Sequence, residues 1–227
     1  MTLSDAVWIL GGYLAGTFPS TWLVSRALGA TAVIRASHRE ASEADAHILL
    51  TQKVAGGWGA LAAILDVAKG MALPLAARRW GNLPDAWVAM VGVAVVVGHA
   101  FPFYLRAMAG RGLAATAGVY LVLVPLPMVV AGVTMCAGIA LRQTGLFSTV
   151  GFGSVPVVAW LQSQPTAYVA MAVAVSVLIF IRRIEGAGDV ARRLGLSWWR
   201  AAAYKAVFDR GERPETADDR AREKGPA

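Results

Sequence analysis

A glycine-rich, basic stretch from Gly98 to Gly118, GHAFPFYLRAMAGRGLAATAG, separates two long apolar runs. Gly110, Arg111 and Gly112 lie near its centre, at the start of the second run. Backbone amides in a glycine turn bind phosphate oxygens, and an arginine adds a fixed charge with two parallel donors. The stretch therefore predicts a phosphate-binding loop at a membrane edge, with His99 at its beginning.

Two further charged residues, Asp66 and Lys69 in LDVAKG, lie inside another apolar run. Their spacing of three places them on one face of a helix, where they neutralise each other. Charged side chains in a membrane helix are costly and are functional candidates by default. Two interpretations stay open: an ion pair that only orients the helix, and a pair that supports the phosphate site.

The composition restricts the class of protein. The chain has 227 residues, of which 57% are hydrophobic and 15% charged, and its mean hydropathy is +0.56. These values predict an all-α, polytopic integral membrane protein of about seven transmembrane helices, some of them short. The predicted spans are Val7–Leu28, Val54–Ala77, Ala86–Leu105, Leu113–Val124, Met128–Leu141, Phe152–Gln162 and Thr166–Ile184.

The number of helices depends on Pro125 and Pro127. Each proline removes a backbone donor, so we expect two short helices there rather than one long helix, although six helices remain an alternative. Seven helices place the basic residues on one side, except Arg78, Arg79 and Lys69, which predicts an outside N-terminus and a cytoplasmic C-terminus. The same positive-inside bias accounts for the net charge of +7, so no nucleic-acid partner is expected.

The chain changes character at Glu185. We expect a membrane-embedded domain over residues 1–184, followed by a cytoplasmic segment over residues 185–227. The start of that segment, DVARRLGLSWWRAAAYKAVF, interleaves arginines with aromatic residues and is typical of an interfacial amphipathic helix. Its last residues, GERPETADDRAREKGPA, form a polar tail.

The order of these motifs resembles the bacterial acyl-phosphate:glycerol-3-phosphate acyltransferases of the PlsY type over about 190 residues. LDVAKG matches that family's Asp-x-x-Lys-Gly, GHAFP and the following loop are similar to its Gly-His-x-Phe-Pro motif, and QTGLFSTVG resembles its Thr-x-x-x-Ser segment. The resemblance implies acyl transfer from an acyl-phosphate to glycerol-3-phosphate, which yields lysophosphatidate without a metal, a cofactor or acyl-CoA.

The resemblance also implies the roles of individual residues. Arg111, in place of the family's loop lysine, holds a phosphate together with the amides of Gly110 and Gly112, and His99 orients the loop. Ser42 and Ser148 hydrogen-bond substrate oxygens. Candidate catalytic residues are thus Ser42, His99, Arg111 and Ser148, and candidate substrate-binding residues are Lys53, Asp66, Lys69, Gly110 and Gly112.

Other family positions are altered, so the chain is expected to be a divergent member. The family's first motif, Gly-Ser-Gly-Asn-x-Gly-Ala-Thr-Asn followed by an arginine, has lost both asparagines here, and Gln52, beside Lys53, stands in place of its arginine. Either Ser42 or Ser37 occupies the position of its serine. The final His-x-x-Asn motif is assigned to Gly186 and Asp189.

These losses leave alternatives open: a catalytically impaired homologue that binds lipid or a partner protein, an acyltransferase with another acceptor, and a small transporter. The expected location is the bacterial inner membrane, among membrane lipids and as a monomer.

Overall fold

The computed structural model describes residues 2–40, 50–51, 54, 56–104 and 110–208. Over these residues the chain is all-α, as predicted, and no strand occurs. The helices are α1 (Leu3–Gly16), α2 (Ser20–Ala27), α3 (Thr31–Glu40), α5 (Gly56–Arg79), α6 (Asp85–Ala100), α7 (Leu113–Leu123), α8 (Pro125–Ala140), α9 (Thr144–Leu161), α10 (Thr166–Ile184), α11 (Ala187–Leu194) and α12 (Trp198–Val207).

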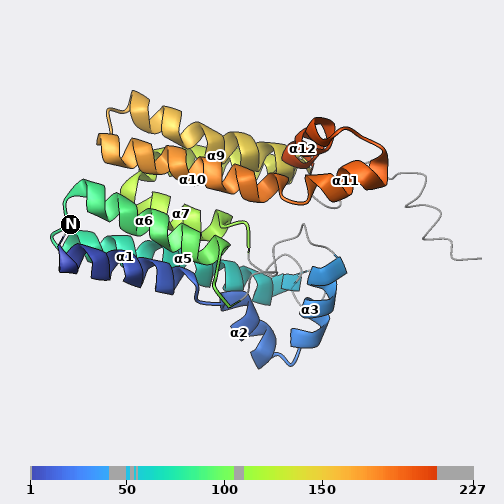
Figure 1. The fold of residues 1–227 in the computed structure, drawn as a ribbon, viewed down its shortest axis with the longest axis horizontal. Coiled ribbons are helices and arrows are strands. Elements are labelled where there is room, and N and C mark those ends of the chain that lie inside the picture. The colour runs from blue at the N-terminus through green and yellow to red at the C-terminus, as the bar shows by residue number, and fades with distance from the viewer. Residues whose placement is uncertain (1, 41–49, 52–53, 55, 105–109, 209–227) are drawn as a thin grey trace, which may run out of the picture.

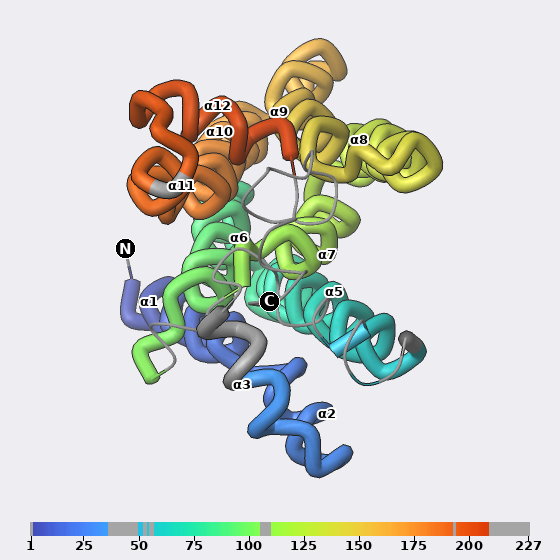
Figure 2. Tube along the Cα trace, turned by 90° about the vertical axis from the view of Figure 1, so that its right-hand side faces the viewer, coloured from blue at the N-terminus to red at the C-terminus, as the bar shows by residue number. Residues whose placement is uncertain are grey.

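The long helices run lengthwise in stacked layers (Figure 1). α9 and α10 form one layer, α6 and α7 lie beside it, and α1 and α5 form the opposite layer, while the end-on view shows α8 next to α9 (Figure 2). The short helices α2, α3, α11 and α12 gather at one end of this bundle, away from the N-terminus. The start of α7 points to that same end, which therefore carries Arg111 as well as the arginines of the short helices (Figure 1), whereas Arg78 and Arg79 at the end of α5 lie at the opposite end.

The first predicted span, Val7–Leu28, is wrong as a single helix. α1 ends at Gly16, and α2 begins at Ser20 after a break at Thr17–Pro19. Pro19 has no amide donor and disfavours helical geometry at Phe18, which explains the break. The Thr17 hydroxyl donates to the Leu14 carbonyl and helps to close α1.

The expected interruption at the double proline is confirmed. Val124 has an extended φ of −139°, as expected for a residue before proline, and separates α7 from α8. Pro125 then occupies the first position of α8, where its missing donor costs no intrahelical hydrogen bond.

The other observed helix bounds agree with the predicted spans to different degrees. α10 has the predicted bounds, and α5 lies within two residues of its prediction at each end. α9 begins at Thr144, eight residues before the predicted start at Phe152. The segment between the first two predicted spans, Val7–Leu28 and Val54–Ala77, contains a helix, α3, over Thr31–Glu40.

Two helix pairs approach so closely that their contact positions must be glycine. A Cβ at Gly16 would lie 2.1 Å from the Val95 carbonyl oxygen, between α1 and α6. A Cβ at Gly70 would lie 2.1 Å from the Ala115 carbonyl oxygen, between α5 and α7. Small residues that let helix backbones touch are typical of packing inside membranes.

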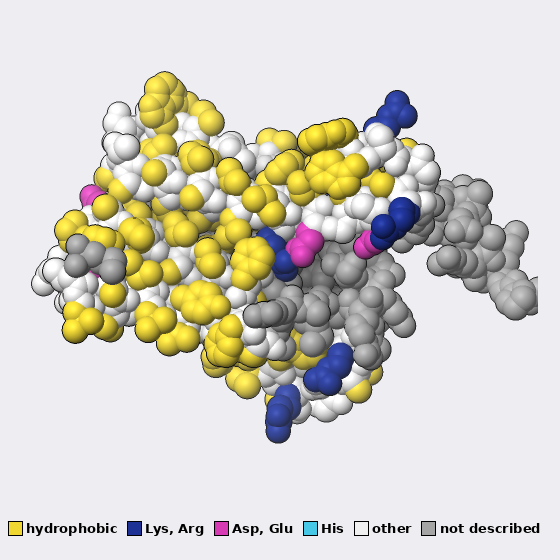
Figure 3. Space-filling model, viewed as in Figure 1, with side chains coloured by type: hydrophobic (Ala, Val, Ile, Leu, Met, Phe, Trp, Pro, Cys, Tyr) yellow, Lys and Arg dark blue, Asp and Glu magenta, His cyan; other side chains and the backbone are white. Residues whose placement is uncertain are grey.

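The surface is that of a membrane protein. Apolar side chains cover most of the bundle in Figure 3, and the lysines and arginines visible on that face lie in the middle and the right-hand part of the view. Among the described residues, Gly57–Arg79, Thr144–Leu161 and Thr166–Arg192 are long and apolar enough to cross a bilayer. α6, α7 and α8 are shorter apolar helices.

The segment after α10 forms two short helices rather than one amphipathic helix. α11 begins and ends at glycines with left-handed φ, Gly186 at +79° and Gly195 at +65°. Gly195 turns the chain back, so α12 packs on α9, α10 and α11. Trp198 and Trp199 remain exposed at the start of α12.

Candidate functional site

The loop between α6 and α7 is fastened to α1 where the structure describes it. The Tyr13 hydroxyl donates to the Phe101 carbonyl over 3.1 Å, and the Tyr104 hydroxyl donates to the Thr17 carbonyl. Partial burial raises the pKa of the Tyr104 hydroxyl above its ordinary value, so this donor keeps its proton at neutral pH. The two tyrosines therefore hold the beginning of the loop against α1.

The end of the loop is shaped by its two glycines. Gly112, with φ of +92°, is the residue before α7 and adopts a conformation that other residues rarely accept. A Cβ at Gly110 would lie 2.6 Å from Nε2 of His99. Gly110 therefore packs directly on the imidazole of His99, which lies against the end of the loop.

Asp66 and Lys69 form a buried ion pair. Lys69 Nζ lies 2.7 Å from Asp66 Oδ1, and Asp66 is 3% exposed. Lys69 also donates to the Phe18 carbonyl over 2.7 Å, at the break after α1. His99 Nδ1 lies 3.6 Å from Asp66 Oδ1. The pair thus joins α5 to the break after α1 and faces the histidine under the loop.

Asp66→Ala is expected to destabilise the protein by about 3 kcal/mol, because it leaves the Lys69 ammonium buried without its carboxylate. Unfolding in detergent micelles measures this loss. Asp189→Ala is the matched control: its carboxylate is exposed and pairs with the exposed Arg192, so we expect less than about 1 kcal/mol. Similar effects of both variants would contradict the assignment.

The double variant Asp66→Leu with Lys69→Leu separates the two interpretations of this pair. Replacing both charges by apolar side chains restores much of the stability. If the pair only orients α5, activity returns as well. If the pair supports the site, the double variant is stable and inactive.

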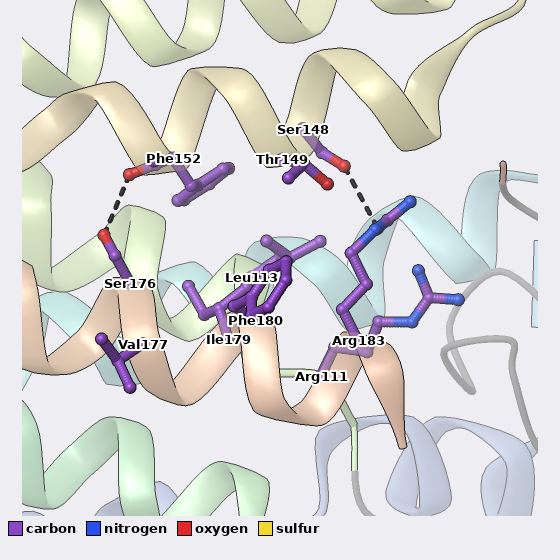
Figure 4. Close-up of a pocket in the computed structure, with 11 residues that line it drawn as sticks. Arg111, Leu113, Ser148, Thr149, Phe152, Ser176, Val177, Ile179, Phe180 and Arg183 are labelled. Atoms are coloured by element: carbon purple, nitrogen blue, oxygen red, sulfur yellow. Dashed lines mark hydrogen bonds between the residues drawn. The ribbon is translucent and has the colours of Figure 1, made fainter. Parts of the chain in front are cut away.

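A cavity of about 290 Å³ lies between α9, α10 and the start of α7. Apolar side chains form most of its wall, and Arg111, Arg183 and Ser148 lie together at one end (Figure 4). None of the described lining residues is acidic. The described residues that line the cavity are Arg111, Leu113, Ser148, Thr149, Phe152, Gly153, Ser176, Val177, Ile179, Phe180 and Arg183.

Arg183 is the most buried cation of this cavity, at 4% exposure. Its Nη1 donates to the Ser148 hydroxyl over 3.3 Å, and its Nε donates to the Ala206 carbonyl over 3.2 Å. The Ser148 hydroxyl in turn donates a hydrogen bond to the Gly145 carbonyl over 3.0 Å. A buried guanidinium beside a second arginine attracts an anion, and the apolar wall accommodates an alkyl chain.

Arg182 links α10 to the loop. Its guanidinium stacks on the Phe101 ring at 5.1 Å, and its Nη2 lies 3.5 Å from the Gly110 carbonyl oxygen. The same side chain forms an ion pair with Glu185. Arg182 therefore contacts the loop at both ends while Arg183, the next residue, faces the cavity.

The structure brings some of the predicted residues together and separates others. Arg111 and Ser148 share the cavity, whereas His99, Asp66 and Lys69 form a group beneath Gly110. Ser148 falls between the predicted spans Met128–Leu141 and Phe152–Gln162, but it is a buried residue of α9, because that helix starts earlier than predicted. Ser42 and Lys53 lie outside the described residues.

The sequence prediction missed Arg183. It assigned the final motif to Gly186 and Asp189, but the Asp189 side chain is exposed and paired with Arg192. Spacing by three also fits Arg183 and Gly186, and Arg183 reaches the cavity. The available signal was a charged residue within the predicted Thr166–Ile184 span, where ionisable residues are functional candidates. Arg183 was instead interpreted as one of the basic residues that indicate the orientation of the chain in the membrane.

The fold and the site define a helical membrane protein with a basic, apolar-walled cavity that suits a lipid with an anionic head. Among the described residues, no group of histidine, cysteine or acidic side chains could hold a metal. The sequence model of the glycerol-3-phosphate acyltransferase family matches residues 6–192. The chain belongs to this family.

Individual relatives agree with that assignment. The glycerol-3-phosphate acyltransferase of Rubrobacter xylanophilus is 33% identical over 195 residues, covering 83% of this chain and 92% of that protein. The enzyme of the same name from Pseudomonas paraeruginosa is 31% identical, covering 78% and 92%. The crystal structure of PlsY, an integral membrane glycerol 3-phosphate acyltransferase in its lysophosphatidic acid form, shares the fold with a TM-score of 0.69. It is 21% identical, covering 85% of this chain and 92% of that one.

Proposed function

We propose that the protein transfers an acyl group from an acyl-phosphate to glycerol-3-phosphate at the cytoplasmic face of the bacterial inner membrane. The observation that carries the proposal is the cavity with Arg111 and Arg183 at one end and apolar walls along the rest. An acyl-phosphate has this same division into an anionic head and an alkyl chain. The names of the relatives support glycerol-3-phosphate as the acceptor.

The two arginines bind the phosphate of the acyl donor. A guanidinium matches phosphate oxygens with two parallel donors, and two of them offset the charge of one phosphate in a poorly hydrated site. The acyl chain then lies against Phe152, Ile179 and Phe180, where water is excluded. The donor carbonyl is thereby held near the mouth of the cavity, within reach of an acceptor at the loop.

The reaction needs no protein nucleophile. The primary hydroxyl oxygen of glycerol-3-phosphate attacks the acyl carbon, and an ester bond forms. The bond between that carbon and the phosphate oxygen breaks, and the phosphate leaves with the electron pair. The leaving phosphate takes the hydroxyl proton, which balances the step as lysophosphatidate and inorganic phosphate. Arg111 and Arg183 stabilise the charge that collects on the leaving group.

Ser148 acts as a hydrogen-bonding residue in this scheme. A serine nucleophile requires a neighbouring base, but the described contacts of Ser148 are the Gly145 carbonyl and Arg183. Its hydroxyl therefore orients the guanidinium and a donor oxygen.

On the acceptor side, the amides of Gly110 and Gly112 bind glycerol-3-phosphate together with Ser42 and Lys53. Lys53 compensates for the arginine that Gln52 replaces, so the altered motifs change how the acceptor is held rather than abolish turnover.

The arrangement of the termini follows the same proposal. The short helices and the site lie at the end of the bundle opposite the N-terminus (Figure 1), which supports an outside N-terminus and a cytoplasmic segment over residues 185–227.

The test uses purified protein, palmitoyl-phosphate and labelled glycerol-3-phosphate. Labelled lysophosphatidate is expected with palmitoyl-phosphate and not with palmitoyl-CoA. Arg111→Ala is expected to lower the initial rate at least about tenfold, because one of two phosphate-binding cations is lost. Absence of product, or full activity of Arg111→Ala, would overturn the proposal.

A further inference from the structure

α12 lies beyond residue 192, where the family match ends, so the match provides no expectation for its role. The helix packs across the ends of α9 and α10, the two helices that form most of the cavity wall. In Figure 1 it covers the end of that layer. Its contacts with the cavity residues are specific hydrogen bonds.

One backbone oxygen of α12 holds two cavity residues. The Ala206 carbonyl oxygen lies 3.2 Å from Arg183 Nε and 2.8 Å from Thr149 Oγ1. Both donors line the cavity beside Ser148 (Figure 4). Since Nε of Arg183 is directed to α12, the Nη1 side of the same planar group is directed to Ser148.

Lys205, the preceding residue, fixes α12 on the end of α10. Its ammonium donates to the Glu185 carbonyl, and its side chain is 5% exposed. Glu185 is the C-terminal cap of α10, where unpaired carbonyls carry partial negative charge. A buried lysine there satisfies a carbonyl and complements the helix dipole, so it stabilises this contact more than a surface ion pair would.

An arginine at the end of a membrane helix has many rotamers and tends to extend toward the aqueous interface. The Ala206 carbonyl opposes that movement. We propose that α12 is a positioning element that holds the Arg183 guanidinium in the cavity for the anionic head of the acyl donor. This inference rests on the proposed function, and Thr149 and Lys205 are its positioning residues.

Two matched pairs of variants test the role of α12. Thr149→Val removes the hydroxyl that donates a hydrogen bond to the Ala206 carbonyl, and Thr149→Ser retains that hydroxyl. Lys205→Met removes the buried ammonium, and Arg200→Met removes an exposed charge from the same helix. We expect Thr149→Val and Lys205→Met each to raise the Kd for dodecyl phosphate and the KM for palmitoyl-phosphate about tenfold. Thr149→Ser and Arg200→Met stay within about twofold.

A cycle with Arg183→Met distinguishes positioning from a general loss of structure. Because α12 acts through Arg183, Lys205→Met is expected to have little further effect on Kd in the Arg183→Met background. A full additional tenfold loss there, or unchanged dodecyl phosphate binding by Lys205→Met alone, would overturn the role of α12. Unchanged binding by Arg183→Met itself would instead overturn the proposed cavity function, so the two failures are distinguishable.

Discussion

Arg183→Met is expected to lower kcat/KM for palmitoyl-phosphate about a hundredfold, equivalent to about 2.7 kcal/mol of lost transition-state stabilisation. The guanidinium is nearly fully buried, contacts Ser148 and lines the cavity proposed for the donor phosphate. Hydrogen bonds to charged groups contribute about 1.5–3 kcal/mol, and a methionine of similar length preserves the packing of the stem. Initial rates across palmitoyl-phosphate concentrations measure the change.

Two controls sharpen this prediction. Arg192→Met removes a guanidinium whose side chain is 81% exposed, and we expect activity close to that of the native chain. Arg183→Lys keeps the charge but cannot bridge Ser148 and the Ala206 carbonyl with one planar group, so an intermediate rate is expected. Arg183→Met with native kcat/KM and native melting temperature would rule out a role in substrate binding.

Gly70→Ala is expected to destabilise the protein by about 3 kcal/mol, at the upper end of overpacking effects. The new methyl group would lie 2.1 Å from the Ala115 carbonyl oxygen and 3.1 Å from the Gly118 Cα. Both obstacles belong to the backbone of α7, so no side-chain rotation relieves the contact. For a chain of this length the expected fall in Tm is about 6–12 °C in detergent.

Gly132→Ala is the matched control for that experiment. Gly132 lies inside α8, and a Cβ there meets no atom within 4 Å. Alanine is the better helix former, so this variant should keep the native Tm or raise it. The free energy of unfolding should increase by up to about 1 kcal/mol. Equal losses for both glycines would mean that the contact between α5 and α7 does not require a glycine.

Helix bounds could be predicted from the sequence where a proline marks the start of the helix and a change from apolar to polar residues marks its end. α10 follows Pro165 and ends where the apolar run becomes polar, so both of its bounds could be identified. α9 could not, because its first turns carry Gly145, Ser148 and Thr149, which resemble a polar loop. The Ser148 and Thr149 hydroxyls lie within hydrogen-bond distance of the Gly145 carbonyl in α9, and Thr149 also contacts the Ala206 carbonyl of α12. Hydropathy along the sequence does not reveal this tertiary contact.

The site was predicted only in part for a related reason. The glycines of the loop and Arg111 were candidates from the sequence because phosphate binding requires a local pattern of amides and charge. Arg183 depends on α12 for its position, and the contact joins residues 23 positions apart. The sequence pattern does not predict that contact, so Arg183, near the end of α10, was interpreted only as one of the basic residues that indicate membrane orientation.

The hydrogen bond from Lys69 to the Phe18 carbonyl bears on how the protein is assembled during synthesis. α1 has 14 residues and extends about 21 Å, which is less than the bilayer core of about 30 Å. The Phe18 carbonyl, just after α1, accepts its hydrogen bond from Lys69, which lies 51 residues later in α5. α5 leaves the ribosome after α1 has been synthesised. The hydrogen bond that completes the break after α1 can therefore form only after α5 has been synthesised.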